Sequence, residues 1–225
     1  MTISLTYDDK IAILELGDDE NRFSPDFLDE IDTRFDEIVA GGAHGLVTTS
    51  ASKFYTNGLD LDWLTAHAEQ HQWYVGRVHA LLAHVLTLPI PTAAAVVGHA
   101  FGAGAMLALA HDFRVMRADR GFFCFPEVDI HIPFTPGMAA VIQAKLTPQA
   151  AVASMTTGRR FGGDDAVSVG IVDATAAEGA VTDAAVDLLR PLGGKDPGTL
   201  GAIKQTMFAH AVEVLTANSQ EPKSD

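Results

Sequence analysis

Hydrophobic and polar residues change their spacing several times along this chain, and each spacing predicts an element. Residues 3–7 and 11–16 both alternate and are separated by a short polar turn, which indicates a β-hairpin. Ser24 followed by Pro25 is typical of a helix start. Apolar residues then recur at helical spacing until Gly41-Gly42, so a helix is expected between these points.

Three short apolar runs follow, at residues 46–49, 92–97 and 113–116, and they favour buried strands. Helical patterns separate them, and strands that alternate with helices favour parallel βαβ crossovers in an α/β fold. The sequence also predicts a small strand over 121–125, a turn into a strand at 170–173 and a turn opening into a helix over 98–110. It predicts a helix start at 163 and helices over 59–84 (as one piece or two), 135–145, 148–157, 181–192 and 197–215.

No linker rich in Pro, Gly or Ser divides the chain, and no internal repeat is evident, so one domain over residues 1–225 is expected. Its core should span about 3–195, followed by a C-terminal helical segment over about 196–215. Residues 216–225 are polar and are expected to form a frayed tail.

The net charge of −14 argues against nucleic acid or an anionic membrane as a partner, because both require a basic surface. Cys124 is the only cysteine, which excludes an intrachain disulfide framework and fits a cytoplasmic protein. Residues 1–7 lack the features of a signal peptide, and the last three residues are not a peroxisomal signal. Residues 78–110 carry no Asp, Glu, Lys or Arg, but Pro89 and Pro91 interrupt them, which favours buried elements over a membrane span.

The first segment that could carry chemistry is Asn57-Gly58-Leu59-Asp60-Leu61, between a short strand and a helix. Gly58 permits backbone conformations that other residues avoid, so the Leu59 amide could point into a cavity and stabilise developing negative charge. An ordinary strand-to-helix loop is the alternative interpretation.

The second segment, residues 98–106, is rich in glycine and alanine and also opens a helix. Small residues allow the backbone to approach a ligand closely, although close helix–strand packing would use the same composition. Its glycine spacing is neither that of the dinucleotide fingerprint nor that of a P-loop.

The third segment places Glu127 among apolar neighbours, between Phe125-Pro126 and Val128. Desolvation in such a setting raises the pKa of a carboxyl group toward neutrality and makes it a better base. A surface glutamate beside Pro126 is the alternative.

In their order along the chain, these segments resemble the crotonase (enoyl-CoA hydratase/isomerase) superfamily. Residues 57–61 resemble its first oxyanion-hole loop, residues 98–104 its second, and residues 123–130 the stretch that carries a catalytic glutamate. Residues 157–161 and 166–173 resemble a later conserved stretch of the family. Each motif alone is unspecific, whereas the ordered set is specific.

The resemblance runs from Ile3 to about Leu215. It implies a ClpP/crotonase-type spiral of ββα repeats with C-terminal helices, assembled as a homotrimer or a dimer of trimers. It also implies an acyl-CoA thioester substrate in fatty-acid metabolism, with coenzyme A as part of the substrate and with no metal or other cofactor. In this interpretation Glu127 is the catalytic residue, and the amides of Leu59 and Ala103 form the oxyanion hole.

One departure from the family pattern bears on the reaction. The second glutamate of the hydratases falls on Met106, which cannot hold or deprotonate water. Glu127 alone can still move a proton from C2 of a 3-enoyl-CoA to C4, and the sequence is similar to single-glutamate isomerases around residues 54–61 and 125–130. A Δ3,Δ2-enoyl-CoA isomerase is therefore the leading hypothesis.

Two alternatives remain open. A hydratase could take its second carboxylate from Asp129 or Asp60. A chain that has lost catalysis could bind acyl-CoA or serve as a structural subunit, although such a protein has no need of Glu127 in an apolar setting.

An acidic chain that binds coenzyme A needs local cations for the phosphates. Each candidate cation could equally be a solvated surface charge. The expected contacts with substrate and coenzyme A are Arg22, Lys53, Asn57, Gly58, Gly102 and Lys204, and the expected acyl pocket is Trp63, Met106 and Ile132.

Overall fold

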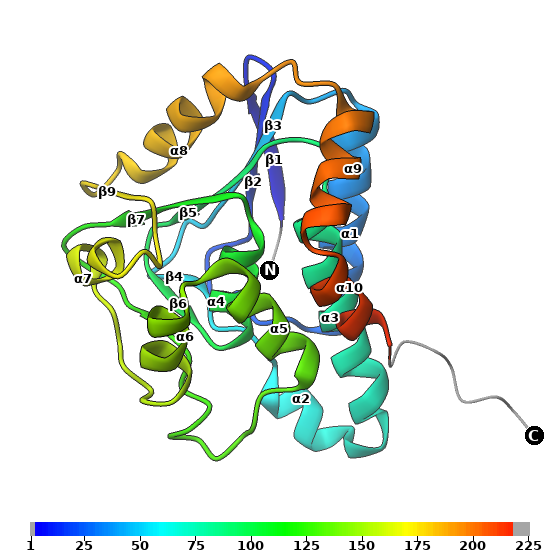
Figure 1. The fold of residues 1–225 in the computed structure, drawn as a ribbon, viewed down its shortest axis with the longest axis vertical. Helices are drawn as coiled ribbons and strands as arrows, with labels where there is room; N and C mark the ends of the chain where they lie inside the picture. Colours follow the sequence, from blue (N-terminus) through cyan, green and yellow to red (C-terminus); the bar gives the residue numbers. More distant parts are fainter. Residues whose placement is uncertain (1–2, 218–225) are drawn as a thin grey trace, which may run out of the picture.

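A six-stranded sheet forms the centre of the computed structural model, which describes residues 3–217 (Figure 1). Its order is β1-β2-β3-β5-β7-β9, and β1 and β2 form the predicted antiparallel hairpin. All other neighbours are parallel, as the alternation of strands and helices predicted. The strands are β1 (Ser4–Asp8), β2 (Ile11–Glu15), β3 (Gly45–Thr49), β5 (Thr92–Val96), β7 (Phe113–Arg117) and β9 (Ala174–Ala176).

A second, smaller sheet has the order β4-β6-β8, and its strands are parallel. They are β4 (Phe54–Thr56), β6 (His99–Phe101) and β8 (Phe123–Cys124). Only β8 was predicted. β4 and β6 have three residues each, which is too short for an alternating pattern to appear.

The helices agree with the predicted segments apart from an unpredicted break in the last one. The segment 59–84 forms two pieces, α2 and α3. The segment 197–215 divides at Phe208, whose ring is buried and whose backbone leaves the helical region. The helices are α1 (Pro25–Ala40), α2 (Leu61–Ala66), α3 (His71–Thr87), α4 (Ala103–Ala110), α5 (Pro136–Lys145), α6 (Pro148–Met155), α7 (Gly163–Ser168), α8 (Val181–Leu189), α9 (Pro197–Met207) and α10 (Ala209–Thr216), with 3-10 turns at Ala68–Gln70 and Arg190–Leu192. Of the predicted frayed tail, residue 216 ends α10, and residues 218–225 lie outside the described part of the chain.

The large sheet is covered on both faces. On one face α8 packs against Val47, Ala95 and Val115, whereas most other helices cover the opposite face (Figure 1). The uncharged stretch 78–110 is divided among α3, β5, β6 and α4 and is mostly buried. Within residues 3–217, no helix combines the length and apolar character needed to cross a bilayer.

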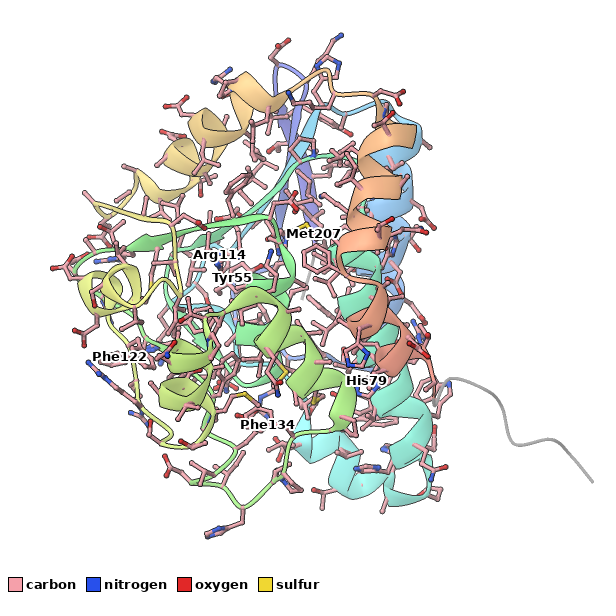
Figure 2. All side chains as sticks on the ribbon, viewed as in Figure 1. Tyr55, His79, Arg114, Phe122, Phe134 and Met207 are labelled. Carbon is pink, nitrogen blue, oxygen red and sulfur yellow. The ribbon has the colours of Figure 1, made fainter. Side chains whose placement is uncertain are left out.

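A buried chain of hydrogen bonds joins the two sheets. The hydroxyl of Tyr55 on β4 is 2.7 Å from the hydroxyl of Thr48 on β3, which is 2.9 Å from Nε2 of His111. All three side chains are fully buried, and Tyr55 lies in the interior of the molecule (Figure 2). Because unpaired polar groups are costly in the interior, this chain specifies how the small sheet sits on the large one.

Candidate active site

The three segments singled out in the sequence meet at one edge of the small sheet. Residues 57–59 follow β4, residues 102–103 follow β6, and Glu127 comes shortly after β8. Because these strands are parallel neighbours, their carboxyl ends lie at the same edge. The sheet therefore brings together segments that are more than 20 residues apart in the chain.

The first two loops touch each other at Gly58. Its φ of +77° is in the left-handed region, and a Cβ atom there would lie 2.8 Å from both the Gly104 nitrogen and the Phe101 oxygen. A side chain would therefore clash with backbone atoms that cannot move aside easily. The Gly58 carbonyl accepts a hydrogen bond from the Phe23 amide at 2.8 Å, which holds the peptide in this orientation.

The amides of Leu59 and Ala103 are available for a ligand. Both residues line a common cavity, and neither N–H donates a hydrogen bond to any residue in the described range 3–217. Ala103 is also the first residue of α4, where the amides carry the positive end of the helix dipole. These two donors match the predicted oxyanion hole in position and in availability.

Glu127 faces the same cavity as a poorly solvated carboxylate. Its exposed fraction is 8 %, and no residue of the described chain hydrogen-bonds its buried Oε2 atom. Desolvation raises the pKa of Glu127 from 4.5 to about 7, an effect that a backbone hydrogen bond partly opposes. The side chain can thus accept and return a proton near neutral pH.

The cavity has a volume of about 300 Å³, and apolar side chains form part of its walls. Leu61, Phe101 and Ile130 contribute to these walls, and the sequence analysis had not assigned them to the acyl pocket although all three lie within its motifs. The predicted residues that line the cavity are Arg22, Asn57, Leu59, Gly102, Ala103, Glu127 and Ile132.

Arg22 lies at this cavity but is already paired. Its guanidinium is 2.6 Å from a carboxylate oxygen of Glu20 and 2.6 Å from one of Asp62. These contacts raise the pKa of Arg22 and neutralise most of its local charge. Asn57 lies beside them, with Nδ2 3.4 Å from the Glu20 carboxylate.

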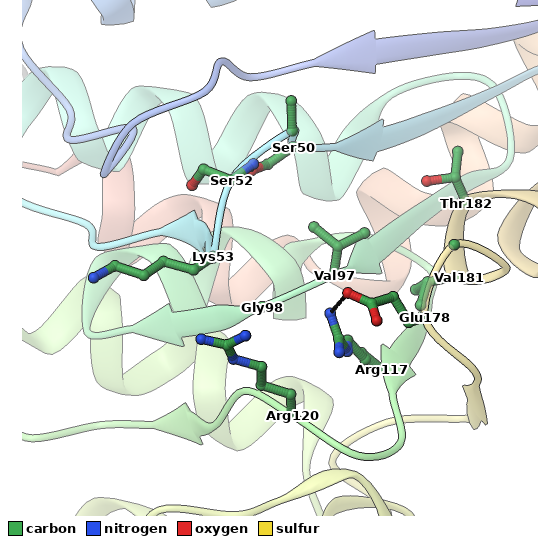
Figure 3. Close-up of a pocket in the computed structure, with 12 residues that line it drawn as sticks. Ser50, Ser52, Lys53, Val97, Gly98, Arg117, Arg120, Glu178, Val181 and Thr182 are labelled. Carbon is green, nitrogen blue, oxygen red and sulfur yellow. Dashed lines mark hydrogen bonds and ion pairs between the residues drawn. The ribbon is translucent and has the colours of Figure 1, made fainter.

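Two predicted coenzyme A contacts lie elsewhere. Lys204 is only 4 % exposed, and its Nζ donates to the Asp112 carboxylate at 2.6 Å and to the Ile90 carbonyl at 2.8 Å. The prediction for Lys204 is wrong because this buried pair faces the interior. Lys53 lines a different cavity, which Figure 3 shows, and is absent from the lining of the cavity that contains Glu127.

Trp63 and Met106 do not line the cavity either, in contrast to the predicted acyl pocket. The Trp63 ring stacks on His67 and Tyr74, with centroid separations of 4.3 and 5.2 Å. Met106 is 1 % exposed and packs in the main hydrophobic core. Periodicity could not separate these core positions from the walls of a pocket, because both are apolar.

Neither candidate for a second catalytic carboxylate lines the cavity. Asp60 caps α2 by accepting a hydrogen bond from the Trp63 amide at 3.1 Å, and Asp129 is exposed. Besides Glu127, the one carboxylate among the lining residues of this cavity is that of Asp62, which is 89 % exposed and paired with Arg22. The cavity therefore contains a single buried carboxylate.

This arrangement suits proton transfer next to a carbonyl group. Two unpaired amides can stabilise an oxyanion, and a base with a pKa of about 7 lines the same partly apolar cavity. In the described part of the chain, no group of three or more His, Cys, Asp or Glu side chains is arranged to hold a metal ion.

Comparisons with known proteins agree with this geometry. The sequence profile of the enoyl-CoA hydratase/isomerase family matches residues 8–223. The chain is 37 % identical to peroxisomal enoyl-CoA delta isomerase 1 of Arabidopsis thaliana, over 82 % of this chain and 80 % of that protein, and 35 % identical to enoyl-CoA delta isomerase 3 of the same plant, over 90 % and 91 %. The crystal structure of a probable enoyl-CoA hydratase from Mycobacterium tuberculosis superposes with a TM-score of 0.89 at 25 % identity, covering 96 % of this chain and 92 % of that one. This chain therefore belongs to the enoyl-CoA hydratase/isomerase family.

Proposed function

We propose that this protein is a Δ3,Δ2-enoyl-CoA isomerase, which moves the double bond of a 3-enoyl-CoA thioester into conjugation with the carbonyl group. The observation that carries this proposal is the single buried carboxylate of Glu127, which faces the same cavity as the unpaired amides of Leu59 and Ala103. One base is sufficient for a 1,3-proton shift, whereas the addition of water to a double bond requires a water molecule to be held and activated as well.

In the proposed reaction the thioester oxygen lies between the amides of Leu59 and Ala103. Glu127 removes a proton from C2, the electrons move toward the carbonyl group, and a dienolate forms. Each amide stabilises its oxygen by about 3 kcal/mol relative to the ground state. The protonated Glu127 then returns the same proton to C4, which places the double bond between C2 and C3. The proton is recycled and no electrons are exchanged, so the step consumes no cofactor.

The environment of Glu127 supports this role. A pKa of about 7 leaves the side chain largely ionised in slightly alkaline solution, yet makes it a stronger base than a solvated glutamate. The apolar residues Leu61, Ile130 and Ile132 lie around it and provide walls that suit a hydrocarbon chain.

The hydratase alternative is less well supported. Met106 occupies the position at which hydratases of the family carry their second glutamate, and it is buried in the core. Asp129 and Asp60 do not line the cavity, so neither is placed to activate water there. Sequence similarity favours the isomerase as well, since two relatives at 37 % and 35 % identity are enoyl-CoA delta isomerases.

The test is a pair of absorbance assays on the purified protein, with 3-hexenoyl-CoA and crotonyl-CoA as substrates. A rise in conjugated-enoyl absorbance with the first substrate and no loss with the second is the expected result. Loss of conjugation with crotonyl-CoA would identify a hydratase. Binding of acyl-CoA without turnover of either substrate would identify a non-catalytic protein.

We also propose that the protein assembles as a homotrimer, as its family resemblance implies. The exposed face of α9 supports this assembly, because Ile203 and Met207 are 55 % and 69 % exposed and line an open groove. Light scattering coupled to gel filtration should give three times the chain mass of 23.9 kDa. A monomeric mass at micromolar concentration would contradict the proposal.

A further inference from the structure

The peptide between Gly58 and Leu59 carries one of the two oxyanion donors, and glycine makes this peptide easy to rotate. A peptide group is planar and trans, so the Leu59 N–H points away from the Gly58 carbonyl. That carbonyl accepts a hydrogen bond from the Phe23 amide at 2.8 Å, which leaves the N–H on the opposite side of the peptide. Because glycine has many allowed backbone conformations, the loop needs further contacts to keep this donor in place.

The amides on either side of Leu59 are both held by side-chain hydroxyl groups. The Gly58 amide donates to Oγ1 of Thr56 at 3.0 Å, and the amide of Asp60 donates to the hydroxyl of Tyr74 at 2.8 Å. Leu59 lies between them, and its own amide has no acceptor in the described part of the chain. The peptide that carries the free N–H is therefore flanked by two peptides whose orientations are fixed.

The Thr56 hydroxyl, at the end of β4, is oriented by a second hydrogen bond. It donates its one proton to the Asn21 carbonyl at 2.6 Å, so its oxygen is left to accept from Gly58. Thr56 and Asn21 are both fully buried. The side-chain amide of Asn21 in turn donates to the carbonyl groups of Tyr55 at 3.0 Å and Phe54 at 3.3 Å, which attaches it to the same strand. Loss of the hydroxyl would leave two buried backbone groups without a partner.

Thr56 also touches the loop that carries the second donor. A Cβ atom on Gly104 would clash with the Thr56 carbonyl oxygen and would lie 2.8 Å from its Cγ2 methyl group. Gly104 directly follows Ala103, whose amide is the other oxyanion donor. The hydroxyl of Thr56 therefore holds the first loop, while its methyl group and backbone pack against the second.

Tyr74 reaches the same loop from α3. Its side chain is fully buried, and burial raises the pKa of its hydroxyl to about 12, so the group stays protonated near neutral pH. The Trp63 ring stacks on the Tyr74 ring with a centroid separation of 5.2 Å. The Trp63 amide also donates to the Asp60 carboxylate at 3.1 Å. Trp63, which does not line the cavity, thus packs against the group that holds the Asp60 amide.

We propose that Thr56 and Tyr74 are positioning residues of the oxyanion hole, whose hydroxyl groups prevent rotation of the peptide that carries the Leu59 amide. Neither side chain lines the cavity that contains Glu127, so both act through the backbone of the loop. Donors stabilise an oxyanion best when they are oriented before the charge develops, and a displacement of about 1 Å can lower a rate about a hundredfold. This inference rests on the proposed isomerase function, because the Leu59 amide is a donor to its dienolate oxygen.

The test uses variants of the full chain that each remove one hydroxyl group, with 3-hexenoyl-CoA as the substrate. Thr56→Val and Tyr74→Phe should each lower kcat about tenfold or more and change KM less than about twofold, because the charge on the oxygen develops only during the reaction. Thr56→Ser keeps the hydroxyl and should retain kcat within about threefold. The matched control is Thr49→Val, because Thr49 is also buried and its hydroxyl bonds to that of Thr182. This control should leave kcat within about twofold of wild type.

A binding measurement separates this inference from the proposed function. Acetoacetyl-CoA ionises to an enolate with negative charge on its thioester oxygen, whereas the thioester oxygen of butyryl-CoA is neutral. Isothermal titration calorimetry gives the affinity of each protein for both ligands. Thr56→Val and Tyr74→Phe should weaken the binding of acetoacetyl-CoA about tenfold more than that of butyryl-CoA. This ratio needs no turnover, so a wild-type protein that does not isomerise 3-hexenoyl-CoA would leave the test intact.

Several outcomes would overturn the proposal. These are an unchanged ratio of affinities in either variant, a change confined to KM, and a loss of kcat that is the same in Thr56→Ser as in Thr56→Val. A loss of the same size in Thr49→Val would also overturn it, because any buried hydroxyl would then have the same effect. Circular dichroism verifies the fold of each variant, and Tyr74→Phe decides the outcome if Thr56→Val does not fold.

Discussion

Replacement of Glu127 by glutamine should remove activity and yet stabilise the protein at alkaline pH. The pKa of Glu127 is about 7 in the folded protein and 4.5 as an unperturbed group. Between pH 4.5 and about pH 7, the Glu127 side chain binds fewer protons in the unfolded state than in the folded state. Its contribution to the free energy of unfolding therefore falls as the pH rises through this window, and it is constant above it. A shift of this size corresponds to about 3 kcal/mol, and the side chain is buried enough for little solvent screening.

The Glu127→Gln variant does not lose stability in this way, because its side-chain amide stays neutral at every pH and has nearly the same shape as a protonated carboxyl group. Glu127→Gln should thus be more stable than wild type by about 3 kcal/mol at about pH 8, and by less than about 1 kcal/mol at about pH 5. For a chain of this size, the alkaline difference corresponds to a rise in Tm of about 6–12 °C. The turnover number should fall by about 10²–10⁴ because the general base is lost.

Urea unfolding of both proteins at the two pH values measures the effect. The difference between the two free energies of unfolding at each pH cancels the contributions of other titrating groups, which the substitution leaves unchanged. If the variant and the wild type differed in free energy of unfolding by the same amount at both pH values, or if the variant were less stable at about pH 8, desolvation would not be the cause of the raised pKa of Glu127. Retained isomerisation in the variant would remove Glu127 from the mechanism altogether.

Other consequences of the site can be tested separately. The kcat/KM for 3-hexenoyl-CoA should decline as pH falls below about 7, because the base form of Glu127 is then depleted; a profile that is flat from pH 8 to about 5 would contradict this assignment. Gly58→Ala should lower kcat about a hundredfold while circular dichroism stays unchanged, because the new Cβ would force apart the loops that carry the Leu59 and Ala103 amides. Lys204→Met should destabilise the protein by about 1–3 kcal/mol in urea unfolding, since it removes the ion pair of the half-buried Asp112, whose carboxylate keeps its hydrogen bonds from Thr92. The KM for enoyl-CoA should stay the same in that variant, and a tenfold increase would restore Lys204 as a coenzyme A contact.

The elements with strong local signals were predicted well. The hairpin of β1 and β2 follows from alternation, and α1 begins where Ser24 caps the helix and Pro25 occupies its first position. By contrast, β4 and β6 depend on pairing with each other across more than 40 residues of sequence. No local pattern reveals a three-residue strand whose partners are so distant.

The same distinction applies to the site residues. Glu127, Leu59 and Ala103 could be singled out as candidates because each lies in a segment with its own composition and a defined place in the order of motifs, and all three line one cavity in the structure. The assignments of Lys204, Trp63 and Met106 failed because each depended on which way a side chain points. A lysine on a helix looks the same in sequence whether it faces solvent or the half-buried Asp112.

By itself, the sequence determined the strands of the large sheet, most of the helices and the family, and it singled out Glu127 as the candidate base, because these are recorded in short patterns of residue type. Only the tertiary structure decided that the ends of β4, β6 and β8 share one edge, and that the Leu59 and Ala103 amides are unpaired beside Glu127. The raised pKa of Glu127 is also a tertiary property, since residues from three loops together exclude water from its carboxylate. Burial and mutual distance arise from packing between distant segments, and a linear pattern does not contain them.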